Sequence, residues 1–149
     1  ASKVDNRVAE QIQKELDGGL FDKSLWENFS SRIQSVISNF HDWLKNSFEE
    51  GRIVFGYGAA AKASTLLNAA KIDKSWLKAI ADGSHEKQGR YMPVNGIPIL
   101  SPEEMFRVKP TDVVIFPWNI QEELVAAIEK ESGGNIRIWK AIPHLERIG

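Results

Sequence analysis

The sequence predicts an α/β protein: a Rossmann-like, three-layer domain with a mostly parallel five-stranded sheet, preceded by two N-terminal helices. Apolar residues recur with helical periodicity up to about residue 50, whereas short apolar strands alternate with helices from residue 52 onward. The strand over 52–56 runs directly into a glycine-rich turn, Gly56-Tyr57-Gly58-Ala59-Ala60-Ala61-Lys62, which opens a helix. We therefore divide the chain into a helical extension or connector over 1–50 and a Rossmann-like domain over 51–149.

The N-terminal extension contains two predicted helices. The first carries a narrow apolar stripe with one member every four residues, Val4, Val8, Ile12 and Leu16. It ends at Gly18-Gly19. The second has a long aromatic stripe over 25–48, and Gly51 follows as its C-terminal cap. We expect the second helix to pack on the sheet; the alternative is a connector whose exposed part packs against an upstream domain.

Helices and strands alternate through the rest of the chain. After the first strand we expect a helix over 60–71, strands over 77–81 and 97–100, a short helix from Ser101, a strand over 112–116, a helix ending near Glu131 and a strand over 136–142. Ser101 is suited to cap its helix, with Pro102 in the first turn. Asn119 and Glu122 resemble a capping box for the last helix.

Composition excludes several classes of function. The net charge of −1, from 19 basic and 20 acidic residues, indicates neither a nucleic-acid partner nor a membrane surface. The absence of cysteine excludes disulfides and thiolate zinc sites, and three scattered histidines predict no metal site. No apolar run approaches the length of a membrane span, so we expect a cytoplasmic protein. No nucleophile–base pair or paired carboxylates are evident, so we expect no catalytic residue in this chain.

The glycine-rich turn predicts a nucleotide-type crevice. In such turns the first glycine permits the tight turn and the second lets backbone approach a ligand closely, roles that fall to Gly56 and Gly58. The amides that follow, from Ala59 onward, are expected to face outward and receive an anion such as phosphate. Lys62 in the first helical turn is either a phosphate contact or an ordinary solvated lysine.

Other polar residues follow strands that end at the same edge of the sheet. Asp82 ends the second strand, at the spacing where an acidic residue meets a ribose hydroxyl; the alternative is a turn aspartate. In the next loop Lys87 and Arg90 flank a glycine and are placed to clamp a diphosphate, unless the loop is simply a charged surface. His85 is a candidate phosphate contact in the same loop.

Three aromatic or amide side chains complete the candidate site. Tyr91 is placed to stack on a base or sugar. Trp118 and Asn119 follow the strand over 112–116, where it opens onto the crevice.

These motifs occur in an order that resembles the C-terminal domain of the sugar C-methyltransferases. The resemblance covers about residues 50–149 and rests on six motifs in register: the glycine-rich turn, Leu66-Leu67-Asn68, Asp82, Lys87-Gln88-Gly89-Arg90-Tyr91, Ile97-Pro98-Ile99 and Pro117-Trp118-Asn119. This chain departs from the family pattern at Ala63, in Gly83-Ser84-His85 and in Val94-Asn95-Gly96. These departures leave the sugar nucleotide open.

The resemblance implies a function. Members of that family methylate a carbon of a nucleotide-activated keto-deoxysugar, and they join a zinc-binding portion, an S-adenosylmethionine-binding domain and this domain. It implies that the present residues bind a nucleotide-diphosphate sugar, whose phosphates meet Gly56, Tyr57, Gly58 and Lys62. S-adenosylmethionine then binds an upstream methyltransferase domain, which is also the packing partner. The chain by itself is then inactive. A dinucleotide-binding oxidoreductase or regulatory domain and a non-catalytic interaction module remain as alternatives.

Overall fold

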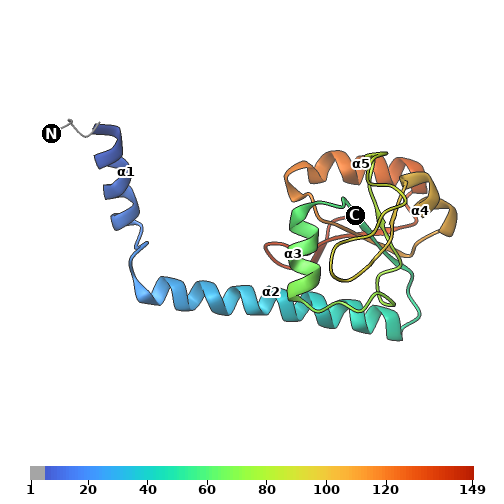
Figure 1. Ribbon diagram of the computed structural model, residues 1–149, viewed down its shortest axis with the longest axis horizontal. Coiled ribbons are helices and arrows are strands. Elements are labelled where there is room, and N and C mark those ends of the chain that lie inside the picture. The colour runs from blue at the N-terminus through green and yellow to red at the C-terminus, as the bar shows by residue number, and fades with distance from the viewer. Residues whose placement is uncertain (1–5) are drawn as a thin grey trace. The chain divides into compact units, whose positions relative to one another are not determined.

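The computed structural model describes residues 6–149 (Figure 1). Helices α1 (Asn6–Asp17) and α2 (Lys23–Glu49) confirm the two helices predicted at the N-terminus. Val4, the first member of the predicted apolar stripe, lies outside the described residues. The chain divides into two compact units between Ser35 and Val36, so α2 contributes its first half to one unit and its second half to the other.

The first unit leaves its apolar stripe exposed. Trp26 packs edge-to-face on Phe29, with ring centroids 6.0 Å apart, and its indole N–H donates to the carbonyl of Leu20 over 2.6 Å. The exposed apolar side chains of this unit are Val8, Ile12, Leu16, Phe21, Leu25, Trp26, Phe29 and Ile33. Such a row of large apolar groups exceeds the scattered single residues that are normal on a protein surface.

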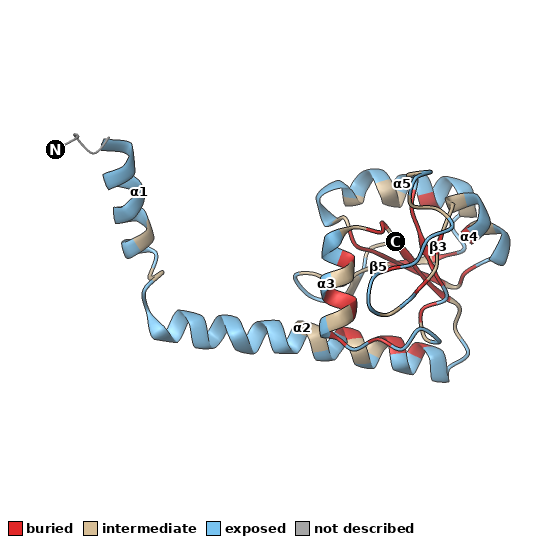
Figure 2. Ribbon diagram, viewed as in Figure 1, coloured by how far each residue is buried: buried red, intermediate tan, exposed pale blue. Residues whose placement is uncertain are grey.

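The second half of α2 is buried against the sheet. Phe40 and Leu44 are fully buried, and the Phe40 ring meets Phe116 edge-to-face with centroids 6.3 Å apart. Trp43 lies 5.1 Å from the ring of Trp139. The change from exposed to buried along one helix is visible in Figure 2. The expected packing of this helix on the sheet is therefore confirmed for its second half.

The sheet has six strands in the order β3-β2-β1-β4-β5-β6. They are β1 (Val54–Tyr57), β2 (Ile80–Ala81), β3 (Ile99–Leu100), β4 (Asp112–Ile115), β5 (Arg137–Lys140) and β6 (Glu146–Arg147). The first five are parallel, and β6 pairs antiparallel with β5 through Trp139 and Arg147. The prediction of five strands was wrong because β6 has only two residues, both charged, and such a segment has no apolar alternation to detect.

The predicted helices are present, with one error at a helix start. They are α3 (Ala61–Ala69), α4 (Pro102–Val108) and α5 (Gln121–Ser132). Ser101 forms a complete capping box with Glu104. The capping box predicted for Asn119 is absent, because a short 3-10 helix, η1 (Trp118–Ile120), precedes α5 and puts Ile120 at the cap position.

Alternate strand residues enter two separate cores, which makes the domain three-layered. Val54, Val114 and Phe116 pack with α2 and α3, whereas Phe55 and Val113 pack with α4 and α5. Figure 1 shows α5 along one side of the sheet and the second half of α2 along the other. The strand order reverses between β1 and β4, which is where doubly wound folds bind ligands, beyond the carboxyl ends of the strands.

A buried carboxylate joins the strands at their amino ends. Asp112 is fully buried and accepts hydrogen bonds from Thr111 Oγ1 at 2.7 Å, Arg137 Nη2 at 2.8 Å and Trp139 Nε1 at 2.8 Å. These partners satisfy a charge whose burial is otherwise costly. Asp112 therefore fixes β4 against β5 at the edge of the sheet opposite the predicted crevice.

Within residues 6–149, no helix combines the length and the apolar composition that crossing a membrane requires.

Replacing one phenylalanine in each half of α2 tests this division. We expect Phe40→Ala to lower the free energy of unfolding by about 3–5 kcal/mol, since a buried aromatic ring leaves a cavity. The matched change Phe29→Ala, at a side chain that is 52% exposed, should alter it by no more than about 0.5 kcal/mol. Urea denaturation followed by circular dichroism measures both, and equal losses would contradict the division.

Candidate functional site

The two glycines of the glycine-rich turn have different roles from those predicted. Gly56 lies within β1, and a Cβ there would stand 2.7 Å from Phe116 Cε2 and 2.9 Å from Ile80 Cγ1. Gly58 makes the turn, with φ +91°, and a Cβ there would stand 2.4 Å from Cγ of Pro117. Gly56 thus permits close packing in the core, and the space over Gly58 that was expected for a ligand is filled by Pro117.

The Asp82 carboxylate closes the mouth of β1 from the other side. Its Oδ2 accepts from the amide of Ala59 at 2.8 Å and from Lys87 Nζ at 2.9 Å, and its Oδ1 accepts from the amide of Ser84 at 2.9 Å. The side chain is buried within this set of donors. The geometry is that of a turn aspartate, the alternative left open by the sequence, because both oxygens are already engaged.

The loop that follows Asp82 is folded by its own polar side chains. Gln88 Nε2 donates to the carbonyl of Asp82 at 2.9 Å, and Gln88 Oε1 lies 3.2 Å from Nδ1 of exposed His85. The amide of Gly89 donates to the carbonyl of Ile99 at 2.9 Å. The sequence placed Gln88 in a family motif without a role of its own, because nothing in a local pattern indicates a backbone partner six positions away.

The basic residues of this loop differ in environment. The ammonium of Lys87 is neutralised by Asp82. Arg90 is exposed, and its guanidinium has no partner within the described part of the chain. Tyr91 is 67% exposed, and its backbone forms a bridge to Pro98. Arg90 and Tyr91 therefore lie at the surface, available to an external group.

Lys62, Trp118 and Asn119 form a second group, which we call the Lys62 cluster. Lys62 Nζ lies 4.1 Å from the centroid of the Trp118 ring and 3.3 Å from Oδ1 of Asn119. The first turn of α3 supplies the lysine and η1 supplies the other two, so the cluster lies beyond the carboxyl ends of β1 and β4. All three residues are exposed.

The Lys62 cluster stands over a small apolar hollow. Its other lining residues are Leu66, Ile115, Phe116, Ala141 and Ile142, and it holds no space for a water molecule. A ligand at this position would therefore rest on the exposed faces of Lys62 and Trp118 instead of entering a deep pocket.

Tyr57 lies apart from the Lys62 cluster. It packs on the other face of the sheet, where burial raises the pKa of its phenol and the nearby Asp82 and Glu103 carboxylates raise it further. The phenol is therefore neutral at pH 7. It lines a groove of about 530 Å³ with Glu103, Phe106 and Arg107, on the face covered by α4 and α5.

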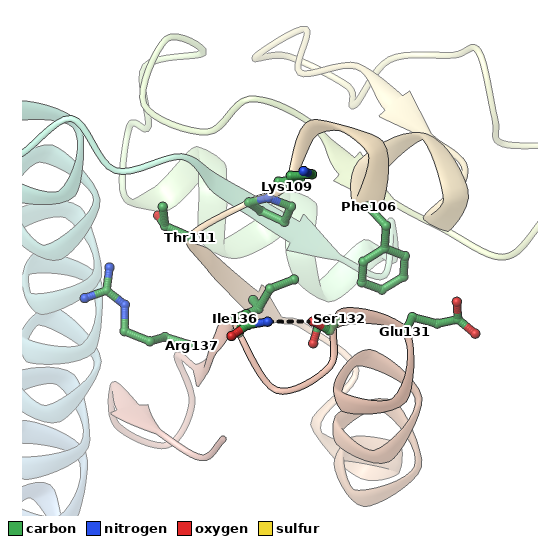
Figure 3. A pocket seen from close by; sticks show the side chains of 9 residues that line it. Phe106, Lys109, Thr111, Glu131, Ser132, Ile136 and Arg137 are labelled. Atoms are coloured by element: carbon green, nitrogen blue, oxygen red, sulfur yellow. Dashed lines mark hydrogen bonds between the residues drawn. The ribbon is translucent and has the colours of Figure 1, made fainter.

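A larger hollow lies at the amino ends of the strands. It measures about 680 Å³ and is lined by residues at the ends of α4 and α5 and at the start of β5, among them Lys109, Ser132 and Arg137 (Figure 3). None of the residues singled out from the sequence lines it. Its lining residues do not form a recognisable catalytic or ligand-binding group. Arg137, for example, is already paired with Asp112.

The structure thus brings the predicted residues together in two groups. One contains Ala59, Asp82 and Lys87, with His85 attached through Gln88. The other is the Lys62 cluster. Across residues 6–149 no three histidine, aspartate or glutamate side chains converge in a way that would hold a metal ion.

Comparison with known proteins gives a consistent family match. The family described as C-methyltransferase C-terminal domain matches residues 1–143. The C-methyltransferase NovU of Streptomyces niveus is 29% identical over 118 residues, which cover 79% of this chain and 28% of that relative. The chain therefore spans less than a third of the length of this relative.

Alanine substitutions at two glycines with positive φ distinguish the cost of the backbone conformation from the cost of a steric clash. We expect Gly51→Ala, at φ +72° with open space around it, to cost about 1 kcal/mol of folding free energy from the left-handed conformation alone. Gly58→Ala should cost about 2–4 kcal/mol, because its Cβ also collides with Pro117. Urea denaturation gives both values, and equal costs would mean that Pro117 does not fill the space over Gly58.

Proposed function

This chain belongs to the C-methyltransferase C-terminal domain family, and we propose that it is the substrate-side domain of an S-adenosylmethionine-dependent C-methyltransferase. Its ligand is a nucleotide-diphosphate sugar. Its contribution is positioning, since holding a substrate in attack geometry lowers the barrier to a reaction whose other groups lie elsewhere.

The Lys62 cluster carries this proposal. The ammonium of Lys62 is exposed, and its neighbours, the Trp118 ring and the Asn119 amide, are uncharged. Its positive charge is therefore available to a phosphate, unlike that of Lys87, which Asp82 neutralises. The Trp118 face offers a surface for a base or sugar ring, and the cluster lies where doubly wound folds bind nucleotides.

Arg90 and Tyr91 are proposed as further contacts. An exposed guanidinium without an internal partner can bind a phosphate through two parallel hydrogen bonds. Tyr91 stands next to it with two thirds of its surface exposed, so its ring can pack on the sugar or base of the same ligand. Both residues belong to the segment that follows β2 toward β3, at the ligand-binding edge of the sheet.

The methyl donor does not fit these residues. Nucleotide-like cofactors approach the backbone over the second glycine and offer ribose hydroxyls to the acidic residue after the second strand. Here Pro117 fills the space over Gly58, and both oxygens of Asp82 bind groups of the protein. We propose that S-adenosylmethionine binds another part of the full-length protein. The same two contacts argue against a dinucleotide ligand.

The same proposal supplies a packing partner for the exposed apolar stripe of the first half of α2. The first half of α2 continues the stripe that its second half buries on the sheet, and Leu25, Trp26 and Phe29 stay exposed there. We propose that the methyltransferase domain of the full-length protein covers this stripe. Burial of these apolar side chains would then contribute to holding the two domains together.

Removing the Lys62 ammonium tests the ligand. We expect the chain to bind thymidine diphosphate, and Lys62→Met to weaken that binding about fivefold, because an exposed ion pair contributes about 1 kcal/mol. Isothermal titration calorimetry measures both. The control Lys130→Met, at an exposed lysine in the last turn of α5, should leave the affinity unchanged.

Two results would contradict this assignment. One is equal affinity of the Lys62→Met variant and the unmodified chain for thymidine diphosphate. The other is binding of NADH, but not thymidine diphosphate, to the unmodified chain, which would favour a dinucleotide-binding domain.

A further inference from the structure

We infer that Asp82 is a specificity-determining residue whose carboxylate occupies the anion-binding position of the glycine-rich turn and keeps external phosphate groups out of it. The inference concerns any anionic ligand, so it stands whether or not the domain binds a nucleotide sugar.

The backbone amide of Ala59 is the first donor after the turn. In glycine-rich strand-to-helix turns, the backbone N–H groups after the second glycine point at the phosphate of a ligand. Here the first of these donors is the amide of Ala59, and it already donates to Oδ2 of Asp82 over 2.8 Å. The Asp82 side chain is 10% exposed. The protein therefore supplies its own anion at the place where a ligand anion is otherwise received.

Three hydrogen-bond donors surround the Asp82 carboxylate. The amides of Ala59 and Ser84 and the ammonium of Lys87 all lie within 2.9 Å of an Asp82 oxygen. Two backbone amides and one lysine are the kind of donor set that holds a phosphate. A carboxylate at their centre satisfies the same donors and cancels the charge of Lys87. An incoming phosphate would have to displace it.

The protein's own side chains restrict access of an external anion to the turn. Pro117 covers Gly58, with Cγ 2.4 Å and Cδ 2.6 Å from the position of an added Cβ, so the turn is closed on that side. Lys87 is the exposed member of the donor set, since its side chain is 43% exposed. An anion that comes in past Lys87 meets the Asp82 carboxylate, which already binds the Ala59 amide.

Removal of the Asp82 charge tests the inference. In Asp82→Asn, the carboxamide oxygen can still accept from one amide, but its NH2 group cannot accept from the other donors. The donors that lose their hydrogen bond to Asp82 are then available to an external anion. With inorganic phosphate as the probe, we expect the variant to bind at least about tenfold more tightly than the unmodified chain, the gain expected for hydrogen bonds to a charged group.

The Ala59 amide resonance in a 15N–1H spectrum reports this binding directly. Phosphate should shift the resonance in the Asp82→Asn variant and leave it in place in the unmodified chain. The double variant Asp82→Asn/Lys87→Met should lose most of the gain, because the ammonium is one of the donors.

The inference is overturned if phosphate shifts the Ala59 resonance of the unmodified chain, or if the folded Asp82→Asn variant gains no affinity. The measurement on the unmodified chain needs no variant, so a poorly folded Asp82→Asn protein does not remove the test. Failure of thymidine diphosphate to bind the Lys62 cluster would contradict the proposed function and leave these outcomes unchanged.

Discussion

The conformation of the turn between β1 and α3 is the constraint on which the candidate site depends. Gly58 adopts φ +91°, which only glycine accepts readily, and its α-carbon is packed against Pro117. Asp82 holds the next amide. These contacts join the segments that follow β1, β2 and β4, so the three carboxyl ends are fixed relative to one another. The first turn of α3, with Lys62, takes its position from them.

This constraint leaves two basic residues of the candidate site in different electrostatic environments. Lys87 and Asp82 form an ion pair that holds the loop after β2 against the turn, so this lysine stabilises the conformation of the loop. Lys62 lies against an aromatic ring and an amide, and its full charge faces outward. The two lysines therefore differ because Lys87 faces a carboxylate and Lys62 faces uncharged groups.

Helix α2 shows how one apolar pattern can meet two environments. Its stripe continues from Leu25 to Leu44. The residues from Val36 onward pack in the core of the second unit, whereas Leu25, Trp26 and Phe29 are exposed. Phe40 packs on Phe116 of the sheet, whereas Phe29 packs on Trp26 of its own helix. The second half of the helix thus stabilises the domain through burial, and the first half leaves the same kind of apolar surface exposed.

The sequence by itself determined the helices, the five parallel strands, the Ser101 cap and the family resemblance, because periodicity, caps and motifs are local properties of the chain. Tertiary structure alone decided the partners of the site residues. Ala59 meets Asp82 across 23 positions, and Lys62 meets Asn119 across 57. Strand β6, with its two charged residues, pairs antiparallel with β5. Such contacts depend on how strands are ordered in space, which no local pattern encodes.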